Sequence, residues 1–572
     1  MAVQFIFGGS GRGKTYFLQH KIMEEAVNNP KKDYIMIVPE QFTMQTQKDM
    51  IKISPGHGIM NVDVQSFVRL AYRVFSETGV GNLSVLDDLG KIMILKKVLG
   101  QNKDELKYFG RNINKDGYIS EIKSFMSELI QYGADEDEIE RMIKASEKKP
   151  VLKYKLQDMS VAFKSFKEYI EKNYITSEEL LSVFADVVSQ SELLKGAVIC
   201  LDGFTGFTPL QYRLLRELIK TAEMVYVTVT ADDRESVINK GKNYQLFFMS
   251  RKTVHNIRQI ASETGVEVLD DIWTGKEISQ TRFGESEELE WLERNLFRYP
   301  YKRYNKKNEV SDISCHVLKY AEDEVDFVVQ KIKGLLVGGC RYRDIAIVAG
   351  SLETYGSIIE HSMKKAGIAC FVDQKRGVQS SVPVRAIDAL LQIIIKDFTY
   401  EDVMDYLKSC LSWTSDSQND ILDNYLLATG IRGFKSWNRE WNTAYAYRRM
   451  TDESKDFANG VVENVRLGVL ENLSELYEKT AKGKHTVREY AASLFEFFER
   501  QHFYEKLMEF ADEYEENENF DMASEYRQLY GMVIEVFEKL VSLMGDEEMS
   551  LKEFKDILDV GFSEARIEVI PP

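Results

Sequence analysis

Short apolar runs alternate with amphipathic segments over the first eighty residues of the chain. Val3–Phe7, Tyr34–Val38 and Val62–Phe67 are rich in apolar and β-branched side chains, a pattern that predicts strands of a sheet. Lys14–Val27, between the first two, has apolar residues at helical spacing. Strand, helix and strand in this order predict a parallel sheet with right-handed crossovers.

The pattern becomes helical between residues 81 and 190. Tyr118–Tyr132 and Leu156–Tyr169 keep a helical period. Ser84 and Ser177 are candidate helix N-caps, because each stands shortly before two acidic residues that would occupy the first helical turn. We therefore predict that residues 81–190 form a helical insertion.

The α/β pattern resumes after this insertion. Ala197–Leu201 and Met224–Thr230 are predicted strands, and Pro209–Thr221 is a predicted helix. Residues 1–80 and 191–300 are thus expected to be two parts of one sheet domain.

A second α/β pattern follows the basic, tyrosine-rich segment Arg298–Lys307. Residues 310–395 are expected to be the first part of a second sheet domain, with three strands and two helices between them. The predicted strands are Ser314–Tyr320, Ile345–Ala349 and Ala369–Val372, and the predicted helices are Asp323–Val337 and Thr354–Ala366. Residues 396–562 are predicted to be a second helical insertion, since proline is absent from 384 to 570. Residues 563–572 begin like a strand, so we expect a return to the second sheet in a longer protein.

Composition narrows the class of protein. The 572 residues are 44% hydrophobic and 29% charged, which is typical of a globular chain. No apolar run reaches the roughly 18 residues of a membrane-spanning helix, and no secretory signal is visible in the first fifteen residues. The five cysteines include no C-x-x-C pair, which argues against a disulfide framework, a zinc ribbon or an iron–sulfur cluster within these residues. These features favour a cytoplasmic protein with no membrane partner. The net charge of −17 argues against a generic nucleic-acid coat protein but leaves room for a local binding groove.

The strongest motif lies directly after the first predicted strand and opens a helix. It fits G-x-x-x-x-G-K-[ST] at every fixed position and consists of Gly8, Gly9, Ser10, Gly11, Arg12, Gly13, Lys14 and Thr15. The glycines let backbone N–H groups curl around phosphates, and the helix N-terminus adds partial positive charge. Lys14 would supply a charge for the phosphates and Thr15 a ligand for Mg²⁺. The motif predicts a nucleotide site, against the alternative of a chance glycine-rich turn.

A second acidic position completes such a site. Asp202 follows the predicted strand Ala197–Leu201 and is the candidate to hold Mg²⁺ through water, although an ordinary strand-end aspartate is the alternative. A motor ATPase usually has a glutamate next, to polarise the attacking water. Here Gly203 follows, so the chain looks better equipped to bind ATP than to hydrolyse it.

Polar and aromatic residues follow the second and third predicted strands. Gln41 and Thr43 follow one, and Phe67, Arg69 and Tyr72 follow the other. Because the carboxyl ends of parallel strands face the ligand crevice, these types suit single-stranded nucleic acid: aromatic rings stack on bases, and Arg and Gln can contact base edges. The alternatives are that Phe67 belongs to the core and that Arg69 pairs with a carboxylate.

Three further features are weaker. Arg298–Lys307 could line a nucleic-acid backbone or could simply link the two sheet domains. Trp437, Trp441, Tyr445 and Tyr447 are expected in core or inter-domain packing. No histidine has a partner at metal or triad spacing, and we find no nuclease constellation in these residues.

Taken in order, the P-loop, VPEQFT (38–43), SFVRLAYRVF (66–75), LDGFTGFTP (201–209) and RYRDIAIV (341–348) resemble the AddB family of bacterial AddAB (RexAB) helicase–nuclease subunits. The resemblance extends over the whole chain. It implies an N-terminal half built like a superfamily 1 helicase, with two RecA-like lobes, 1A and 2A, that carry the helical insertions 1B and 2B. A C-terminal nuclease domain with a four-cysteine iron–sulfur site is then expected only in the full-length protein.

The resemblance also implies a role. AddAB-type complexes process DNA double-strand breaks for recombination: the AddA-type partner subunit is the active helicase, and the AddB half receives the 3′-ended strand and recognises the Chi sequence. Carried onto this chain, the expected Chi-contacting residues are Gln41, Thr43, Phe67, Arg69, Tyr72, Phe204 and Phe207. ATP and Mg²⁺ are the expected cofactors. The chain is expected to have no catalytic residue of its own.

Departures from active helicases support a motor-inactive subunit. Gly203 replaces the catalytic glutamate, and Gly350 stands where an arginine would follow the predicted strand Ile345–Ala349. The intact P-loop suggests the hypothesis that bound ATP stiffens the first lobe and stabilises Chi engagement. The alternatives are an active DNA translocase and a small-molecule P-loop enzyme such as a nucleotide kinase.

Overall fold

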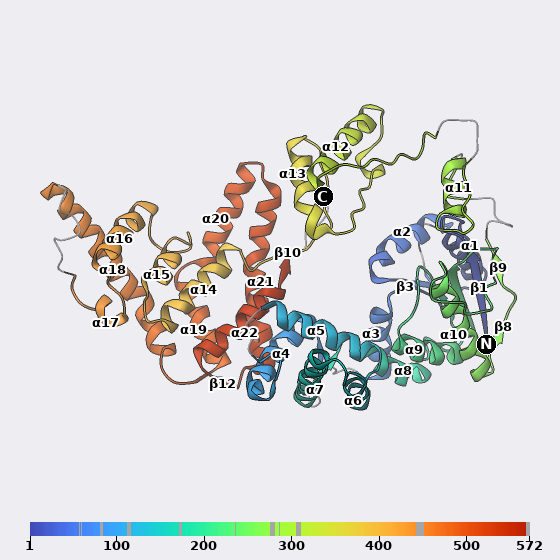
Figure 1. Cartoon of the computed structure of the whole chain (residues 1–572), viewed down its shortest axis with the longest axis horizontal. Helices are drawn as coiled ribbons and strands as arrows, with labels where there is room; N and C mark the ends of the chain where they lie inside the picture. Colours follow the sequence, from blue (N-terminus) through green and yellow to red (C-terminus); the bar gives the residue numbers. More distant parts are fainter. Residues whose placement is uncertain are drawn as a thin grey trace. The chain divides into compact units, whose positions relative to one another are not determined.

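The chain folds into two compact units, shown along the sequence in Figure 1. The first comprises residues 1–86, 124–148 and 170–316, and the second comprises 87–123, 149–169 and 317–572. The computed structural model describes residues 1–567 apart from 57, 59, 81–83, 111–115, 171–173, 235, 275–280, 285, 305–309 and 442–450.

The first unit is built on a seven-stranded parallel sheet. The strands run in the order β3-β2-β6-β7-β1-β8, with β9 also beside β1. They are β1 (Ala2–Gly8), β2 (Tyr34–Ile37), β3 (Val62–Gln65), β6 (Val198–Leu201), β7 (Met224–Thr230), β8 (Glu267–Val268) and β9 (Ile272–Trp273). Every strand predicted in residues 1–80 and 191–300 is present, so the two parts do join in one sheet.

Helices cover both faces of this sheet, because alternate residues of each strand point to opposite sides. Phe5 and Phe7 of β1 pack into the layer formed with helices α3, α8, α9 and α10, and Ile6 packs into the layer formed with α1 and α2. These helices are α1 (Lys14–Asn28), α2 (Thr43–Ile53), α3 (Phe67–Thr78), α8 (Leu180–Val187), α9 (Pro209–Thr221) and α10 (Phe248–Thr264).

The segment 81–190 contains the predicted helices and two strands that the pattern did not reveal. Its helices are α4 (Asp88–Gln101), α5 (Asp116–Gln131), α6 (Glu136–Ala145), α7 (Pro150–Ile170) and α8, and its strands, β4 (Ser84–Leu86) and β5 (Tyr174–Thr176), pair in parallel. The prediction that Ser84 caps a helix is wrong, because Ser84 starts β4 and the Asp87 carboxylate accepts the Gly90 N–H instead. Ser177 is also not the cap: the Thr176 hydroxyl accepts from the backbone N–H of Glu179.

The second unit is helical. Helix α4 packs against α21 and α22, and Gly561 of α22 lies so close to Met93 of α4 that an added Cβ would collide with it. This unit also contains α7, and its helices beyond residue 316 are α12 (Ala321–Val337), α13 (Leu352–Lys365), α14 (Val382–Ile395), α15 (Tyr400–Leu407), α16 (Asp416–Thr429), α17 (Phe434–Trp437), α18 (Asp452–Thr480), α19 (Val487–Arg500), α20 (Phe503–Glu516), α21 (Phe520–Met544) and α22 (Leu551–Glu564). The predicted helical nature of 396–562 is confirmed for the residues that the structure describes.

The strands predicted in residues 310–395 are not formed. Helices α12 and α13 are present, but Ser314–Tyr320, Ile345–Ala349 and Ala369–Val372 have no strand pairing in the structure. A strand is stable only where a neighbour satisfies its backbone groups, and an apolar pattern does not show whether that neighbour is present. Ile345 and Val372 instead pack against the small core between α12 and α13.

Two smaller predictions fall at the edges of the described chain. The strand expected from residue 566 is present as β13 (Arg566–Ile567), which pairs with β10 (Arg376–Gly377), whereas 568–572 lie outside the described residues. Trp437 is buried and its ring lies 4.7 Å from that of Trp441, which confirms the packing role of these two residues. Tyr445 and Tyr447 lie outside the described residues.

The fold class itself, α/β with a large parallel sheet and helical insertions, is confirmed.

Candidate nucleotide site and DNA-facing edge

The P-loop connects the carboxyl end of β1 to the first turn of α1. Gly11 and Gly13 adopt φ angles of +69° and +78°, which non-glycine residues rarely take. A Cβ at Gly9 would collide with the carboxylate of Glu293, and one at Gly8 would collide with the hydroxyl of Thr274. The loop therefore requires glycine at positions 11 and 13 for conformation, and the small residues at 8 and 9 leave room for the Thr274 and Glu293 side chains.

Lys14 folds back over the loop. Its ammonium donates hydrogen bonds to the carbonyls of Gly8 (3.1 Å) and Gly9 (2.8 Å). Burial lowers the pKa of Lys14 to about 8, against the raising effect of the Asp202 and Glu293 carboxylates. A bound phosphate would replace the two carbonyls as the acceptor and favour the charged form.

Thr15 and Asp202 meet at the carboxyl edge of the sheet. The Thr15 hydroxyl donates to Asp202 Oδ1 over 3.2 Å, and the Thr228 hydroxyl of β7 donates to the same oxygen over 2.6 Å. Asp202 is buried and Thr15 is exposed. An exposed hydroxyl beside a fixed, buried carboxylate fits Mg²⁺, which takes few protein oxygens and keeps several waters. Thr15 would hold the ion directly and Asp202 through water.

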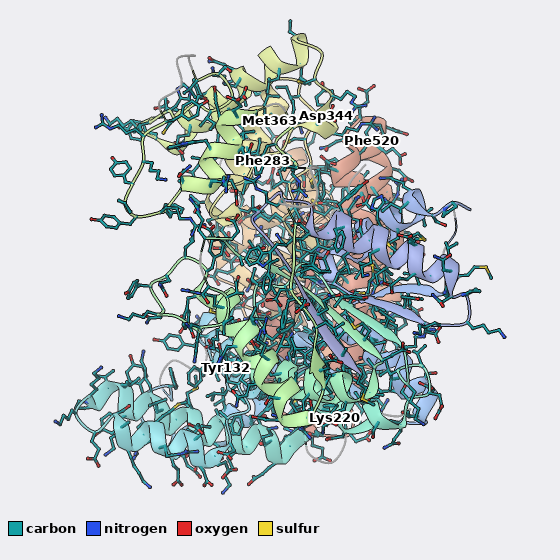
Figure 2. All side chains as sticks on the ribbon, turned by 90° about the vertical axis from the view of Figure 1, so that its right-hand side faces the viewer. Tyr132, Lys220, Phe283, Asp344, Met363 and Phe520 are labelled. Atoms are coloured by element: carbon teal, nitrogen blue, oxygen red, sulfur yellow. The ribbon has the colours of Figure 1, made fainter. Side chains whose placement is uncertain are left out.

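Helix α11 (Glu287–Asn295) and the segment before it cover the loop. Arg12 forms ion pairs with Glu290 (2.7 Å) and Glu293 (3.4 Å) of this helix. The ring of Phe283, labelled in Figure 2, lies 5.2 Å from the Arg12 guanidinium, and the Arg282 N–H donates to the Gly11 carbonyl over 2.8 Å. The covering side chains thus place two carboxylates beside a loop suited to anions. We call residues 282–284 and 286–295 the cover segment.

The residues predicted to contact DNA divide into exposed and buried ones. Gln41, Arg69 and Tyr72 are exposed, and Arg69 forms a 2.8 Å ion pair with Glu40, the pairing that the sequence left open. Thr43 is buried at the start of α2, where its hydroxyl donates to the Glu40 carbonyl. The structure therefore offers three of these side chains to a ligand and uses Thr43 to hold the turn.

Phe67, Phe204 and Phe207 form one aromatic cluster. The ring centroids of Phe204 and Phe207 are 5.1 Å apart, and those of Phe67 and Phe204 are 5.4 Å apart. Phe67 is buried in the sheet core, while Phe204 and Phe207 are half-buried and pack against it. Gly203, which precedes them, is exposed with a φ of +80°. These ring contacts hold the loop after Asp202 close to α3, the helix that carries Arg69.

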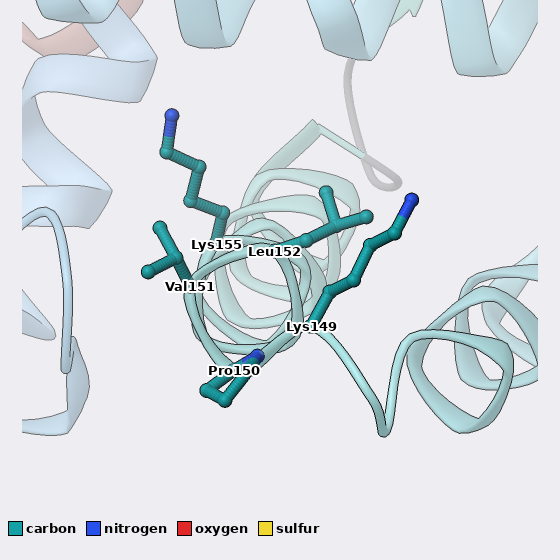
Figure 3. A pocket seen from close by; sticks show the side chains of 5 residues that line it. All are labelled: Lys149, Pro150, Val151, Leu152 and Lys155. Atoms are coloured by element: carbon teal, nitrogen blue, oxygen red, sulfur yellow. The ribbon is translucent and has the colours of Figure 1, made fainter.

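Other candidate sites are weak in the part of the chain that the structure describes. A surface hollow on the first turns of α7 is lined by Lys149, Pro150, Val151, Leu152 and Lys155, and Figure 3 shows that these side chains all come from one helical end. No cluster of His, Cys, Asp and Glu suited to a metal occurs among the described residues. Nor do these residues form a helix long and apolar enough to span a bilayer.

Comparison with known proteins agrees with this geometry. The family model described as "ADDB, N-terminal" matches residues 5–293, which include the P-loop, Asp202 and the cover segment up to Glu293. The chain belongs to the AddB family.

Curated relatives in this family match the chain from end to end. They are named as the B-type subunits of an ATP-dependent helicase/deoxyribonuclease. Those of Lachnoclostridium phytofermentans, Acetivibrio thermocellus and Clostridium novyi are 39%, 32% and 32% identical, each over 100% of this chain. These matches cover 50%, 50% and 49% of the respective relatives. The chain therefore spans about half the length of the AddB proteins that it matches.

Sequence reasoning missed several residues around the candidate nucleotide site. Thr228, Thr274 and the cover-segment residues Arg282, Phe283, Glu290 and Glu293 all contact the P-loop or Asp202. None of these residues belongs to a motif of fixed spacing. They reach the loop because the pairing of strands in the sheet and the position of α11 bring them there. The one signal available for Thr228 was its position near the end of β7, the strand beside β1.

Proposed function

We propose that the chain is the helicase-like half of a subunit that processes DNA double-strand breaks within an ATP-dependent helicase–nuclease. It binds ATP and Mg²⁺ at the P-loop and holds the 3′-ended single strand at the carboxyl edge of the sheet. The observation that carries the proposal is the meeting of Lys14, Thr15 and Asp202 in one site. The names and whole-chain similarity of the AddB relatives support the DNA-processing role.

ATP binding is supported by the chemistry of the loop. Backbone N–H groups at the start of α1 and the Lys14 ammonium suit the phosphates, and the Thr15–Asp202 pair suits Mg²⁺. The bound ion would neutralise phosphate charge. These residues bind and orient the nucleotide; none of them is positioned to activate water.

Motor inactivity is supported by what surrounds Asp202. Gly203 occupies the position after it and has no side chain to polarise a water. Glu293 is the other carboxylate close to Lys14, and it is paired with Arg12. We propose that the chain retains nucleotide without turning it over, and that the bound ATP stiffens the first unit and stabilises the DNA-bound state.

Chi recognition is proposed for the exposed edge of the first unit. Arg69 and Gln41 can contact base edges, Tyr72 can stack, and the cluster of Phe67, Phe204 and Phe207 fixes the surrounding loop. The AddA-type subunit would be the active motor. The nuclease domain and its iron–sulfur site would belong to the half of the protein that this chain does not span, and the complex would act in the cytoplasm.

The decisive experiment measures ATP binding and ATP hydrolysis by the full-length protein, free and assembled with its partner subunit. We expect binding without turnover by this subunit, with or without single-stranded DNA. Lys14→Ala removes a charged hydrogen-bond donor worth about 1.5–3 kcal/mol, so affinity falls about 10- to 150-fold. Lys21→Ala, which removes a cation of the same helix that pairs with Glu25, is the matched control. DNA-stimulated hydrolysis lost in Lys14→Ala would instead identify an active translocase.

Chi recognition needs a separate measurement. The assembled complex is tested on DNA with and without Chi, comparing Gln41→Ala and Arg69→Ala with Arg216→Ala, an exposed arginine of α9 that pairs with Glu263. We expect only the first two variants to lose the Chi response. An unchanged Chi response in Lys14→Ala would overturn the role proposed for bound ATP.

A further inference from the structure

A short segment after α11 presents aromatic rings to solvent. Phe297, Tyr299 and Tyr301 are 81%, 97% and 81% exposed. Exposed side chains of this size are rarely found in series on a soluble protein, and a run of them marks a binding surface. We call residues 296–304 the aromatic linker; it belongs to the first unit and follows α11 in Figure 1.

The aromatic linker is firmly anchored through the residues between the exposed rings. The Arg298 side chain is only 15% exposed, forms a 2.7 Å ion pair with Asp232 and stacks 4.6 Å over the ring of Phe247. Although burial raises the pKa of Asp232, hydrogen bonds from Arg234 and the charge of Arg298 bring it to about 2. Tyr304 packs its ring 5.3 Å from that of Trp291. The exposed rings are therefore carried on a fixed support near the end of β7.

The backbone also holds one ring in an unusual place. Phe297 has a φ of +56°, in the left-handed region that a bulky residue occupies only when its surroundings impose it. Such outliers gather at binding and catalytic sites. Here the backbone strain at Phe297 is not offset by packing of its side chain, because the ring is exposed to solvent.

The charge of the aromatic linker identifies the partner chemistry. Lys302 and Arg303 are exposed and form no ion pair with any residue that the structure describes. No acidic residue occurs from residue 294 to residue 308, in a chain whose net charge is −17. Unpaired cations beside exposed rings match the phosphates and bases of a single strand, since rings stack on any base and cations follow the backbone. Protein interfaces are also rich in tyrosine and arginine but are depleted in lysine, so Lys302 favours the nucleic acid and the test below includes a protein interface as an outcome.

We propose that the aromatic linker is a second contact site for single-stranded DNA, additional to the edge that carries Gln41 and Arg69. Tyr299 and Tyr301 stack on bases without reading their identity, and Lys302 and Arg303 neutralise phosphates. This inference rests on the proposed function, because it assumes that the chain receives a single strand. It assigns to the segment that follows α11 in the first unit a part in holding that strand.

The test uses the full-length protein assembled with its partner subunit and a single-stranded oligonucleotide of mixed sequence. Tyr299→Ala/Tyr301→Ala is expected to weaken affinity about 10- to 100-fold, the loss of one or two stacked bases. Tyr299→Phe/Tyr301→Phe keeps the rings and should restore binding. Lys302→Ala/Arg303→Ala should lower the salt slope by about 1.4, since each phosphate contact on a single strand adds about 0.7.

Matched controls are Tyr132→Ala and Lys148→Ala, which remove an exposed ring and an exposed cation of the first unit outside the aromatic linker; Tyr132 is labelled in Figure 2. A photoreactive thiothymidine in the oligonucleotide should also crosslink to the peptide 296–304. Unchanged affinity and salt slope in the linker variants, with no crosslink, would overturn the inference. So would weakened assembly with the partner subunit at unchanged DNA affinity, which would identify a protein interface.

The same experiment separates this inference from the proposed function. If Arg69→Ala weakens binding and the linker variants do not, the aromatic linker is not a DNA site while the proposed function stands. If neither set of variants changes the binding of single strands and no crosslink to this subunit forms, then the subunit does not contribute to that binding. The proposed function then fails as well.

Discussion

The hydroxyl of Thr15 donates a 3.2 Å hydrogen bond to the carboxylate of Asp202, across 187 residues of sequence. Thr228 holds the same carboxylate oxygen from the neighbouring strand, so the acidic group is fixed before any ion arrives. A preformed pair of this kind reduces the cost of ordering ligands around Mg²⁺. It also leads to a direct test of the metal site.

Substitution at this pair should separate nucleotide affinity from its dependence on Mg²⁺. In Thr15→Val or Asp202→Asn we expect the gain in ATP affinity on adding Mg²⁺ to fall about tenfold or more, since a hydrogen bond to a charged group is worth about 1.5–3 kcal/mol. Affinity without Mg²⁺ should change little. The measurement is a titration of fluorescent ATP with and without the ion. Thr78→Val, on α3, is the control, and an equal loss in both conditions would argue against a metal role.

The lowered pKa of Lys14 should appear in the pH dependence of binding. Burial lowers its pKa to about 8, so the nucleotide-free protein loses this charge as the pH rises above 8. Phosphate favours the charged form, so binding takes up a proton there, and ATP affinity should fall by up to tenfold per pH unit above about 8. Calorimetry in buffers of different ionisation enthalpy measures the uptake. Lys14→Arg keeps its charge and should remove the slope; a wild-type affinity that is constant to pH 9.5 would contradict the prediction.

Removing the carboxylates of the cover segment should strengthen nucleotide binding. Glu290 and Glu293 pair with Arg12 and place negative charge beside the phosphate loop. Arg12 and Glu293 are only 12% and 17% exposed, and at an intermediate dielectric a nearby unit charge repels the phosphates by about 1 kcal/mol, so Glu290→Gln/Glu293→Gln should raise ATP affinity by about fivefold. Glu24→Gln, an exposed carboxylate of α1, is the control. Weaker binding, or loss of an ATPase activity that the parent shows, would mean that Glu293 serves the nucleotide instead of opposing it.

The second unit should depend on Asp158. This buried carboxylate of α7 accepts hydrogen bonds from the backbone N–H groups of Lys107, Tyr108 and Phe109, at 2.8, 2.7 and 2.8 Å. Asp158→Ala leaves these donors without an acceptor, at about 1–3 kcal/mol for each unsatisfied group. We expect a loss of at least about 3 kcal/mol in the free energy of unfolding, measured by denaturant titration together with faster proteolysis at residues 103–110. ATP affinity, measured alongside, should not change.

Much of the first unit could be predicted because its information is local. Val3–Phe7 is apolar and leads into glycines at fixed spacing, and Pro209–Thr221 begins and ends at the predicted residues. Lys14 and Thr15 could be predicted because a phosphate loop has them at fixed spacing, and Asp202 because it follows an apolar strand. The structure brings the three side chains together at the carboxyl edge of the sheet.

The rest of the site depends on contacts that no spacing encodes. Glu293 reaches the P-loop because α11 returns across the sheet edge, and Phe67 is buried because Phe204 and Phe207 pack on it. The strand predicted at Ile345–Ala349 failed for a related reason. Ile345 packs on the α12–α13 core while Ile347 and Val348 are exposed, and strand pairing requires a partner backbone, which a pattern of side chains does not specify.

The position of β1 inside the sheet has a consequence for the synthesis of the protein. β1 pairs with β7 along its whole length, yet β7 leaves the ribosome roughly 200 residues later. At translation rates of about 5–20 residues per second, the apolar side chains of β1 wait about 10–40 s for this neighbour. Such long-range pairing is slow and exposed to aggregation. Nascent chains that end before Met224 should therefore depend on chaperones and fail to bind nucleotide, although they already contain the complete P-loop.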